Sequence, residues 1–423
     1  MTTKLPLQNQ TISNSRRHTR LGVSLLAMAL LIFLLFIGNT KPGQTATFGT
    51  NLSGPDKAIQ IPNIVLPVQP TLYLLIGVTV LLGLWELLRG TRFTGWLIST
   101  AVFCFVVSFL VWATQDNSFS LVGMLGTTLI SATPIALAAL CGVMSERAAV
   151  VNIAIEGILL ISAQTAVVSA TLTHNLYLGL IVAILTGAAV AAVHAVLVIR
   201  FRVDQIVSGT AINIFATGAT SFIAKFYLEK DINLLNNSGT FPAIPIPLLS
   251  RIPILGPILF NNTLIFYTTI VLVVLVHFLL FYTPWGLRTR AVGEHPKAAD
   301  TLGINVYLMR YVNVILGGMI AGVGGAYFTI GSVGRFDQNM TNGKGFIGLA
   351  AMIFGNWNPI GAYLASLLFG FADSLQLKME ILSTPIPSDF LAMAPYIVTI
   401  IVLTGVIGRA IPPAADGKPY EKQ

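Results

Sequence analysis

Long apolar runs, each bounded by polar or charged residues, recur along most of the chain. Each run has about 18 residues or more, enough for an α-helix to cross a hydrocarbon core about 30 Å thick. The pattern therefore predicts membrane-spanning helices over Leu21–Gly38, Thr71–Leu88, Thr94–Thr114, Ser120–Met144, Val150–Leu172, Leu176–Ile199, Ile206–Leu228, Thr263–Tyr282, Tyr311–Ile330, Ile360–Leu377 and Leu391–Ile407.

The region 343–359 interrupts this regularity. Phe346–Phe354 is apolar but too short to span, and a Gly-Asn-Trp-Asn-Pro sequence ending at Pro359 breaks it. Non-helical backbone at membrane depth must be surrounded by protein or water, so we expect a broken or re-entrant element here. The sequence thus predicts an all-α, polytopic membrane protein of about 10–12 transmembrane helices with broken or re-entrant elements.

The distribution of positive charge predicts a cytoplasmic N-terminus. Arg16, Arg17 and Arg20 precede the first run, and no small-x-small cleavage pattern follows closely, which favours a retained first span over a signal peptide. Loops on the same side carry Arg and Lys, whereas the alternate loops are longer or poorer in Arg. We therefore expect a cytoplasmic tail over 1–20 and an external loop over 39–70.

Composition supports a membrane protein and excludes several other classes. Only 9% of the 423 residues are charged, against about 25% in soluble domains. The net charge of +8 is explained by basic cytoplasmic loops rather than by nucleic-acid binding. Cys104 and Cys141 lie within apolar runs and give neither a disulfide framework nor a metal-ligand spacing. The sequence lacks the ATP-binding phosphate loop, so if ATP powers this protein, another subunit must bind it.

The stretch Trp285–Val306 is a polar, net-basic island between two apolar runs. Pro296 suits the first position of a helix, and Gly303 suits a left-handed stop. Ala298, Ala299 and Leu302 would form a small apolar face, so we expect a helix of one to two turns projecting from the membrane. An ordinary solvated loop, whose basic residues only set topology, is the alternative.

Three segments resemble the permease subunits of ABC importers for nucleosides, simple sugars and branched-chain amino acids. They are Ser145–Gly157, the island Gly286–Val306, and Gly343–Gly361. The sequence E-R-A-A-V-V-N-I-A-I-E-G, together with R-A-V-G-E-H-P-K-A-A, is most similar to the nucleoside-type branch. Ala149 and Ala154 stand where that pattern usually has glycine, which predicts a more regular backbone than in relatives. His295 stands where the pattern often has asparagine, a better helix cap.

The resemblance implies a division of the chain and a set of coupling residues. The expected parts are the tail 1–20, extra N-terminal spans 21–114, a permease core 120–408 that contains the coupling segment 285–306, and a C-terminal tail 409–423. The residues implied to couple the permease to an ATPase are Arg288, Arg290, Gly293, Glu294, Pro296, Ala298, Ala299 and Gly303.

The resemblance also implies partners. It implies an ABC ATPase that binds ATP and Mg, a second permease subunit that is identical or different, and an extracytoplasmic substrate-binding protein. The chain itself would be a non-catalytic transport subunit, without cofactor, metal or nucleic acid. It would span the bacterial plasma membrane in contact with membrane lipid.

Polar residues inside the apolar runs suggest a substrate pathway. An ionisable group such as Glu156 is costly within a membrane and is usually functional. Neutral hydrogen-bonding groups suit a nucleoside or a related polyhydroxy solute. The pathway candidates are therefore the ionisable Glu156 and the neutral residues Asn152, Gln164, Asn213 and Thr217. Such residues also bond one helix to another, which is the alternative for each of them.

Other functions fit parts of the pattern. A secondary transporter driven by protons or sodium would need a titratable group at mid-membrane, for which Glu156 is the candidate. An ABC permease for simple sugars or branched-chain amino acids is a second alternative. A non-transporting membrane scaffold or enzyme subunit is a third, and it predicts that replacing Arg288 or Arg290 leaves partner binding and uptake unchanged.

Overall fold

The computed structural model describes residues 7–50, 61–90, 94–382, 390, 393 and 410–422. Within these residues, ten helices are long and apolar enough to cross a membrane. This confirms the predicted polytopic helical fold. The proposed span Leu391–Ile407 lies outside the described residues, apart from Met393. The chain divides into two compact units, one comprising 1–123 and 378–386 and the other 124–377 and 387–423.

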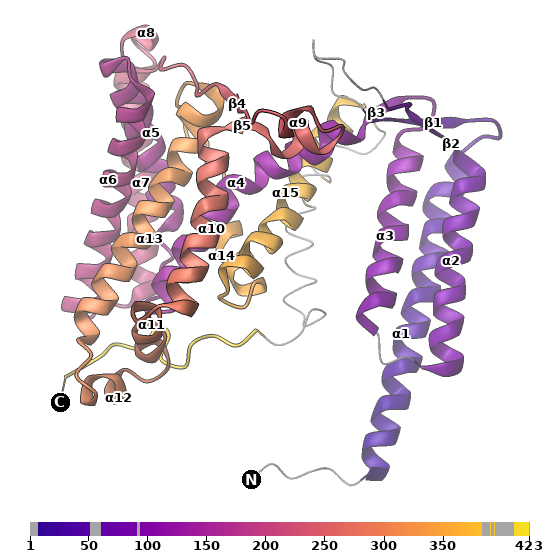
Figure 1. Ribbon diagram of the computed structural model, residues 1–423, viewed down its shortest axis with the longest axis horizontal. Helices are drawn as coiled ribbons and strands as arrows, with labels where there is room; N and C mark the ends of the chain where they lie inside the picture. Colours follow the sequence, from indigo (N-terminus) through magenta and orange to yellow (C-terminus); the bar gives the residue numbers. More distant parts are fainter. Residues whose placement is uncertain are drawn as a thin grey trace. The chain divides into compact units, whose positions relative to one another are not determined.

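The first unit is a bundle of three helices capped by a small sheet (Figure 1). The helices are α1 (Leu7–Phe36), α2 (Val68–Arg89) and α3 (Thr94–Ala113), and α1 packs closely on α2 where Gly22 meets Gly83. In the sheet, β1 (Thr45–Gly49) pairs antiparallel with β2 (Ile64–Pro67) and parallel with β3 (Ser118–Ser120). Two of these strands lie in the predicted external loop, where the sequence pattern had indicated no regular structure.

The second unit contains the remaining helices. Its long helices are α4 (Leu121–Glu146, whose first residues belong to the first unit), α5 (Ile155–Thr173), α6 (Leu176–Ala195), α7 (Gln205–Ile223), α10 (Leu264–Tyr282), α13 (Val306–Phe328) and α15 (Pro359–Ile381). Its short elements are α8 (Ile232–Leu235), β4 (Ala243–Pro245), α9 (Leu255–Leu259), β5 (Asn261–Thr263), α11 (Pro284–Glu294), α12 (Pro296–Thr301) and α14 (Lys344–Phe354).

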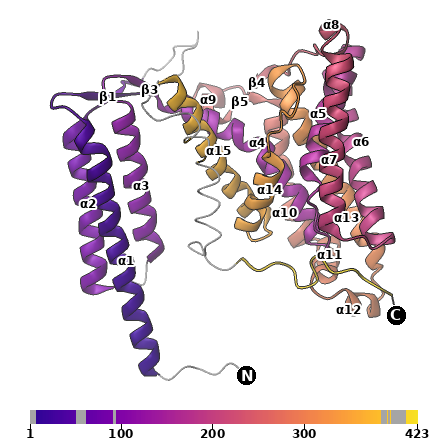
Figure 2. The ribbon, with the colours of Figure 1, turned by 180° about the vertical axis from the view of Figure 1, so that it is seen from behind.

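Helix α13 is the central helix of the second unit because its glycines let neighbouring backbones approach. A Cβ on Gly318 would lie 2.5 Å from the Gly187 carbonyl oxygen of α6, and one on Gly325 would lie 2.4 Å from the Leu159 carbonyl oxygen of α5. Small residues at helix interfaces allow this close packing in membranes. In both ribbon views, α14 and α15 lie on the opposite side of this unit from α6 and α7 (Figures 1 and 2).

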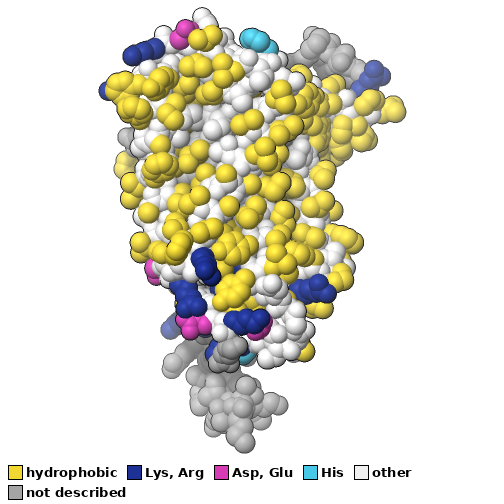
Figure 3. All heavy atoms as spheres, turned by 90° about the vertical axis from the view of Figure 1, so that its left-hand side faces the viewer, with side chains coloured by type: hydrophobic (Ala, Val, Ile, Leu, Met, Phe, Trp, Pro, Cys, Tyr) yellow, Lys and Arg dark blue, Asp and Glu magenta, His cyan; other side chains and the backbone are white. Residues whose placement is uncertain are grey.

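The surface of this unit has the pattern of a membrane protein. Hydrophobic side chains cover the middle of the face shown in Figure 3, and charged side chains gather toward its two ends. On α6 and α7, the exposed apolar side chains include Leu185, Ile214 and Phe215. One end of the unit carries α11, α12 and the C-terminal residues, and it is called the α12 end below.

Candidate functional site

The polar island forms two consecutive short helices. Thr283 caps α11 by accepting a hydrogen bond from the backbone N–H of Gly286 at 3.2 Å. His295 caps α12, because its Nδ1 accepts from the Ala298 N–H at 3.2 Å, and Pro296 takes the first helical position. Gly303 then ends the helix with φ +81°. The short helix, its proline start and its glycine stop were predicted, whereas α11 was missed.

One face of this helical pair is free of the rest of the unit. Arg288, Lys297 and Ala298 are exposed, and Leu302 is 81% exposed. Ala299, by contrast, is 2% exposed and packs with Val292 and Val306 against the transmembrane helices. The predicted apolar face therefore splits, with Ala299 holding α12 in place and Ala298 and Leu302 facing outward beside basic side chains.

The other face contacts the ends of the transmembrane helices. Gly293 is buried, and a Cβ at this position would lie 2.3 Å from the Arg147 carbonyl oxygen. The guanidinium carbon of Arg290 lies 5.1 Å from the centre of the Phe281 ring. Helix α11 therefore packs directly against the segment that follows α4.

The C-terminal residues 410–422 also pack on this face, which the sequence pattern did not indicate. The Ala415 N–H donates to the Gly293 carbonyl at 2.9 Å, and the Ala414 N–H donates to the Glu294 carboxylate at 3.3 Å. Further along, the Tyr420 ring packs against Tyr307 at 5.3 Å. The yellow C-terminal segment in Figure 1 follows this route along the α12 end.

Buried charges join the C-terminal residues to the helix ends. Arg310 of α13 is 2% exposed, and its Nη1 donates to the Lys418 carbonyl at 3.1 Å. Glu146 at the end of α4 accepts from Trp357 Nε1 at 2.6 Å. Asp416 lies between these two groups, and burial raises its pKa to about 6 against the opposing influence of a hydrogen bond with Glu146 and the charge of Arg310.

The segment between α4 and α5 is irregular. Ala149 has φ +63°, in the left-handed region that glycine adopts most readily, so the predicted regular backbone at this position is wrong. The close approach of Gly293 and the hydrogen bond from Val151 N–H to Gln205 at 2.6 Å hold the segment in this shape. For the same reason α5 begins at Ile155 rather than at the predicted Val150.

Glu156 caps the short apolar helix α14. One carboxylate oxygen accepts from the Thr341 hydroxyl at 2.6 Å and the Gly343 N–H at 2.9 Å, and the other accepts from the Gly345 N–H at 2.7 Å. These donors surround the start of α14, whose helix dipole also favours a negative charge there. The carboxylate is therefore compensated although the residue is 7% exposed.

An ion pair lies beside this cap. The Lys344 ammonium of α14 is 2.5 Å from a carboxylate oxygen of Asp373 on α15. Helix α14 has eleven residues, and it therefore rises about 16 Å from the Gly355–Asn358 turn, or about half of a hydrocarbon core. That turn lies at the α12 end, where Asn356 accepts a hydrogen bond from Ile411. Along the helix axis, the ion pair thus lies about half the thickness of a hydrocarbon core from this turn.

The other predicted pathway residues bond helices together or face outward. The Asn213 side chain accepts from the Gly157 N–H and donates to the Ile153 carbonyl, both at 2.8 Å. Gln164 donates to the Thr220 carbonyl at 2.9 Å, and Asn152 donates to Ser145 at 3.3 Å. Thr217 is exposed and bonds its own helix. The structure therefore does not bring the five candidates to a common surface.

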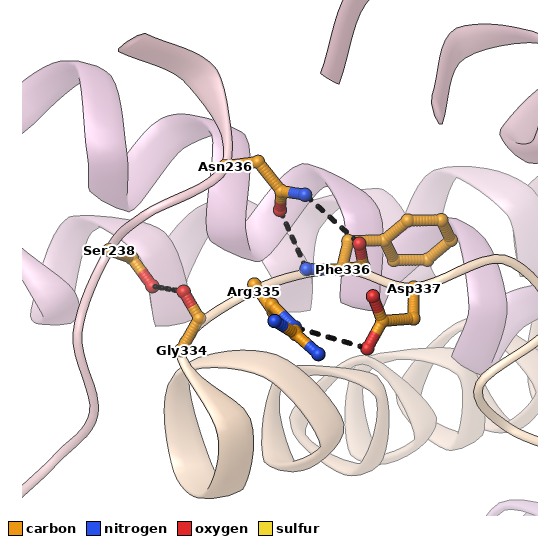
Figure 4. Close-up of polar contacts among 6 residues, drawn as sticks. All are labelled: Asn236, Ser238, Gly334, Arg335, Phe336 and Asp337. Carbon is orange, nitrogen blue, oxygen red and sulfur yellow. Dashed lines mark hydrogen bonds and ion pairs between the residues drawn. The ribbon is translucent and has the colours of Figure 1, made fainter. Parts of the chain in front are cut away.

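The end opposite to α12 is also built from long-range contacts. Asn236 accepts from the Phe336 N–H at 2.6 Å and donates to the Phe336 carbonyl at 3.0 Å, as Figure 4 shows. Ser238 donates to the Gly334 carbonyl in the same view. These bonds fix the loop after α7 to the loop before α14 and leave Arg335 and Asp337 exposed as a pair at 3.3 Å.

Comparisons with known proteins agree with this architecture. The family described as "Branched-chain amino acid transport system / permease component" matches residues 124–410. The guanosine ABC transporter permease protein NupQ of Bacillus subtilis (strain 168) is 45% identical over 311 residues, which cover 70% of this chain and 95% of the relative. The nucleoside ABC transporter permease protein NupC of Lactococcus lactis subsp. cremoris (strain MG1363) is 44% identical over 304 residues, with the same coverages.

A more distant relative carries a different substrate name. The putative glucose ABC transporter permease protein TsgC13 of Haloferax volcanii is 33% identical over 309 residues, covering 68% of this chain and 92% of the relative. No solved structure matches the chain significantly. The family match begins at Met124, where the second unit begins, so α1–α3 and the small sheet precede it. The predicted resemblance is confirmed: the chain belongs to this family of transport-system permease components and is a multi-pass protein of the plasma membrane.

Proposed function

We propose that the chain is the translocating subunit of an ATP-driven importer for nucleosides or related polyhydroxy molecules. The observation that carries this proposal is the pair of helices α11 and α12, which presents Arg288, Ala298 and Leu302 outward while Gly293 touches the backbone after α4. Such a rigid projection suits coupling to a moving partner. The similarity to relatives named for guanosine and nucleosides supports the substrate class.

In this proposal a partner ABC ATPase binds ATP and Mg and docks on the exposed face of α11 and α12. Closure of the ATPase pair moves α11, and the contact between Gly293 and Arg147 passes the movement to α4 and α5. The pathway is then open to one side of the membrane in the nucleotide-free state and to the other side in the ATP-bound state. ATP binding shifts the population from the first state to the second. The coupling residues are Arg288, Arg290, Gly293, Glu294, Pro296, Ala298, Ala299 and Gly303.

Two further partners complete the assembly that we propose. A second permease subunit, identical or different, would lie beside this chain in the membrane. An extracytoplasmic binding protein would deliver the solute to the loops around Asn236 and Phe336. We propose that the N-terminus and the α12 end face the cytoplasm, because α11 and α12 carry basic residues and cytoplasmic segments of membrane proteins are enriched in Lys and Arg.

The ion-driven alternative has weaker support. It needs a mid-membrane group that is free to exchange protons or bind an ion, and Glu156 already accepts three hydrogen bonds that hold the start of α14. A sugar permease is the stronger second candidate, because TsgC13 is named for glucose. The pathway roles of Glu156, Asn152, Gln164, Asn213 and Thr217 stay predictions.

Reconstitution tests the proposal. The complex purified with its co-expressed ATPase and second permease is placed in liposomes, with the binding protein and labelled guanosine, adenosine, cytidine or glucose outside. We expect nucleoside uptake that requires ATP, and Ala298→Asp should abolish it without preventing membrane insertion. Arg251→Glu changes an exposed charge at the opposite end and serves as a control. Uptake that persists without ATP and disappears with the ion gradient would overturn the proposal.

A further inference from the structure

The pair formed by Lys344 and Asp373 has no role in the coupling scheme and lies, along α14, about half the thickness of a hydrocarbon core from the α12 end. Both residues are described, and their side chains keep some exposure, 23% for Lys344 and 12% for Asp373. Charges at this depth are stable only when they face the interior of a protein or water, since exposure of a charge to hydrocarbon is strongly unfavourable. The solvent-accessible part of this pair therefore marks a surface that does not face lipid.

The position of Asp373 on its helix supports this view. Leu364 is 59% exposed and Ile360 and Leu368 lie beside it, forming an apolar stripe suited to lipid or to a partner subunit. Asp373 comes nine residues after Leu364, which at about 100° per residue places the two side chains about 180° apart around the helix. The ion pair thus opens on the inner side of α15, between that helix and α14.

The surroundings of the pair leave it available to a solute, unlike its neighbour Glu156. All three donors on Glu156 come from the backbone or side chains around the start of α14, so that carboxylate cannot accept from a solute without releasing the helix. Asp373 has a single bond to Lys344 among the contacts that the structure shows for its carboxylate. An ammonium and a carboxylate together keep free donor and acceptor capacity.

We propose that Lys344 and Asp373 line the translocation pathway and contact the solute there, an inference that rests on the proposed function. A solute with hydroxyl groups and ring nitrogen or carbonyl acceptors can donate to the carboxylate and accept from the ammonium while the ion pair persists. A charged solute would instead have to compete with one member of the pair. The pair therefore selects a neutral, hydroxyl-rich molecule, of which a nucleoside is one kind.

Thiol labelling tests this placement. Asp373→Cys and Leu364→Cys are made in a chain in which Cys104 and Cys141 are replaced by alanine, and each complex is treated with a charged, membrane-impermeant methanethiosulfonate. Cys104 and Cys141 are buried and free, so their replacement removes background labelling. We expect the thiol at 373 to react and a transported nucleoside to slow the reaction several-fold. The thiol at 364 should be inert or indifferent to the nucleoside.

Transport measurements give a second readout if Asp373→Cys fails to assemble. Lys344→Met, Asp373→Asn and the exchange Lys344→Asp with Asp373→Lys are compared for uptake at saturating and subsaturating nucleoside. We expect each single change to lower uptake about tenfold or more through a weaker contact in the pathway, while the exchange recovers part of it. ATP hydrolysis by the unloaded complex should stay near the wild-type rate.

The outcomes separate this inference from the proposed function. If the wild-type complex moves nucleoside with ATP, but the thiol at 373 is unreactive or unprotected and the single variants transport normally, the pathway assignment is wrong and the importer stands. If the wild-type complex moves no nucleoside in an ATP-dependent way, the proposed function fails first.

Discussion

Glu156 illustrates what a single buried residue does in this membrane protein. An ionised carboxylate within a bilayer is unfavourable unless hydrogen bonds and opposite partial charges compensate it. The Thr341 hydroxyl and the N–H groups of Gly343 and Gly345 provide that compensation. The same bonds satisfy donors that a helix start otherwise leaves unpaired, so the residue and helix α14 stabilise one another.

Replacing Glu156 by glutamine should therefore destabilise the fold. The amide keeps one oxygen but turns an N–H₂ group toward backbone donors, at a cost of about 1–3 kcal/mol. Thermal unfolding of the purified complex in detergent, followed by size-exclusion chromatography, measures the effect. Thr217→Val removes a hydroxyl that only bonds its own helix at an exposed position and is the matched control. Equal melting temperatures for both variants would refute this assignment.

Gly293 illustrates a residue whose importance lies in having no side chain. The Arg147 carbonyl oxygen occupies the space that a Cβ would need, at 2.3 Å. Gly293→Val should push α11 away from α4 and lower ATP-dependent uptake about tenfold or more, while ATP hydrolysis continues. Gly77→Val is the control, because a Cβ there meets nothing within 4 Å. Normal uptake by Gly293→Val, measured in liposomes, would contradict the proposed transmission through this contact.

At the scale of elements, the C-terminal residues 410–422 tie the coupling helices to the transmembrane bundle. They bond Gly293 and Glu294 of α11, Asn356 of the turn between α14 and α15, and Arg310 of α13. The other two nitrogens of the buried Arg310 guanidinium, Nε and Nη2, have no hydrogen-bond partner within the described part of the chain. The segment thus supplies a hydrogen bond to a buried charge and adds contacts that join α11, α13 and the turn between α14 and α15.

A stop codon at Ala410 should loosen this connection. We expect uptake to fall several-fold relative to ATP hydrolysis, because movement of α11 would be passed on through fewer contacts. The ratio of transported nucleoside to hydrolysed ATP measures the coupling. A shorter deletion that removes only 421–423 loses the exposed pair between Arg202 and Glu421 and should have little effect. A normal ratio after the longer deletion would rule out a coupling role for the segment.

The docking of this segment should also depend on pH. The ordinary pKa of the Asp416 carboxyl is 3.8, and burial raises it to about 6 in the docked state. The docked state thus favours the protonated carboxyl, so docking is strongest below about pH 4 and weakens as pH rises through about 6. The anisotropy of a fluorophore at Lys418→Cys should fall between pH 5 and 8. Asp416→Asn should flatten this change, and an unaltered profile would exclude Asp416 as its source.

At the scale of the whole molecule, two units have different relations to the family. The family match covers the second unit up to residue 410 and also residues 378–386 of the first unit, whereas the rest of the first unit precedes it. In the first unit, Glu86 is fully buried in α2 and lies 2.7 Å from His18 of α1. This contact between His18 and the buried Glu86 carboxylate joins α1 to α2, so a polar interaction holds the two helices together in addition to their apolar packing.

The orientation of the molecule can be measured directly. Basic residues before α1 and on α11 and α12 predict that both chain ends face the cytoplasm. Green fluorescent protein fused after Gln423 should fluoresce, and alkaline phosphatase fused there should be inactive. Alkaline phosphatase inserted between Asn51 and Gln60 should be active, because that loop is expected outside. The opposite pattern of activities would reverse the orientation and remove α12 from the reach of a cytoplasmic ATPase.

The sequence by itself determined the features that depend on neighbours along the chain. Apolar runs placed the ten described spanning helices to within a few residues, since helix length must match the membrane. Pro296 and Gly303 placed α12, because proline and glycine restrict the backbone locally. The residue order of three segments indicated the family. The backbone at Ala149 was mispredicted, since the tertiary packing of this segment, in which Gly293 approaches the nearby Arg147 carbonyl, overrides the local preference of alanine.

Only the tertiary structure decided which polar groups meet. Glu156 and Thr341 are 185 positions apart, and Ala414 and Glu294 are 120 apart, so no local periodicity connects them. The five candidate pathway residues have polar side chains, which suit either a substrate pathway or a hydrogen bond between helices. The sequence alone could not decide between these two roles. In the folded chain Asn213 and Gln164 bond neighbouring helices, and their roles in a pathway stay predictions. Folding also brings Lys344 to Asp373, because a charge in a membrane is stable only beside a compensating partner.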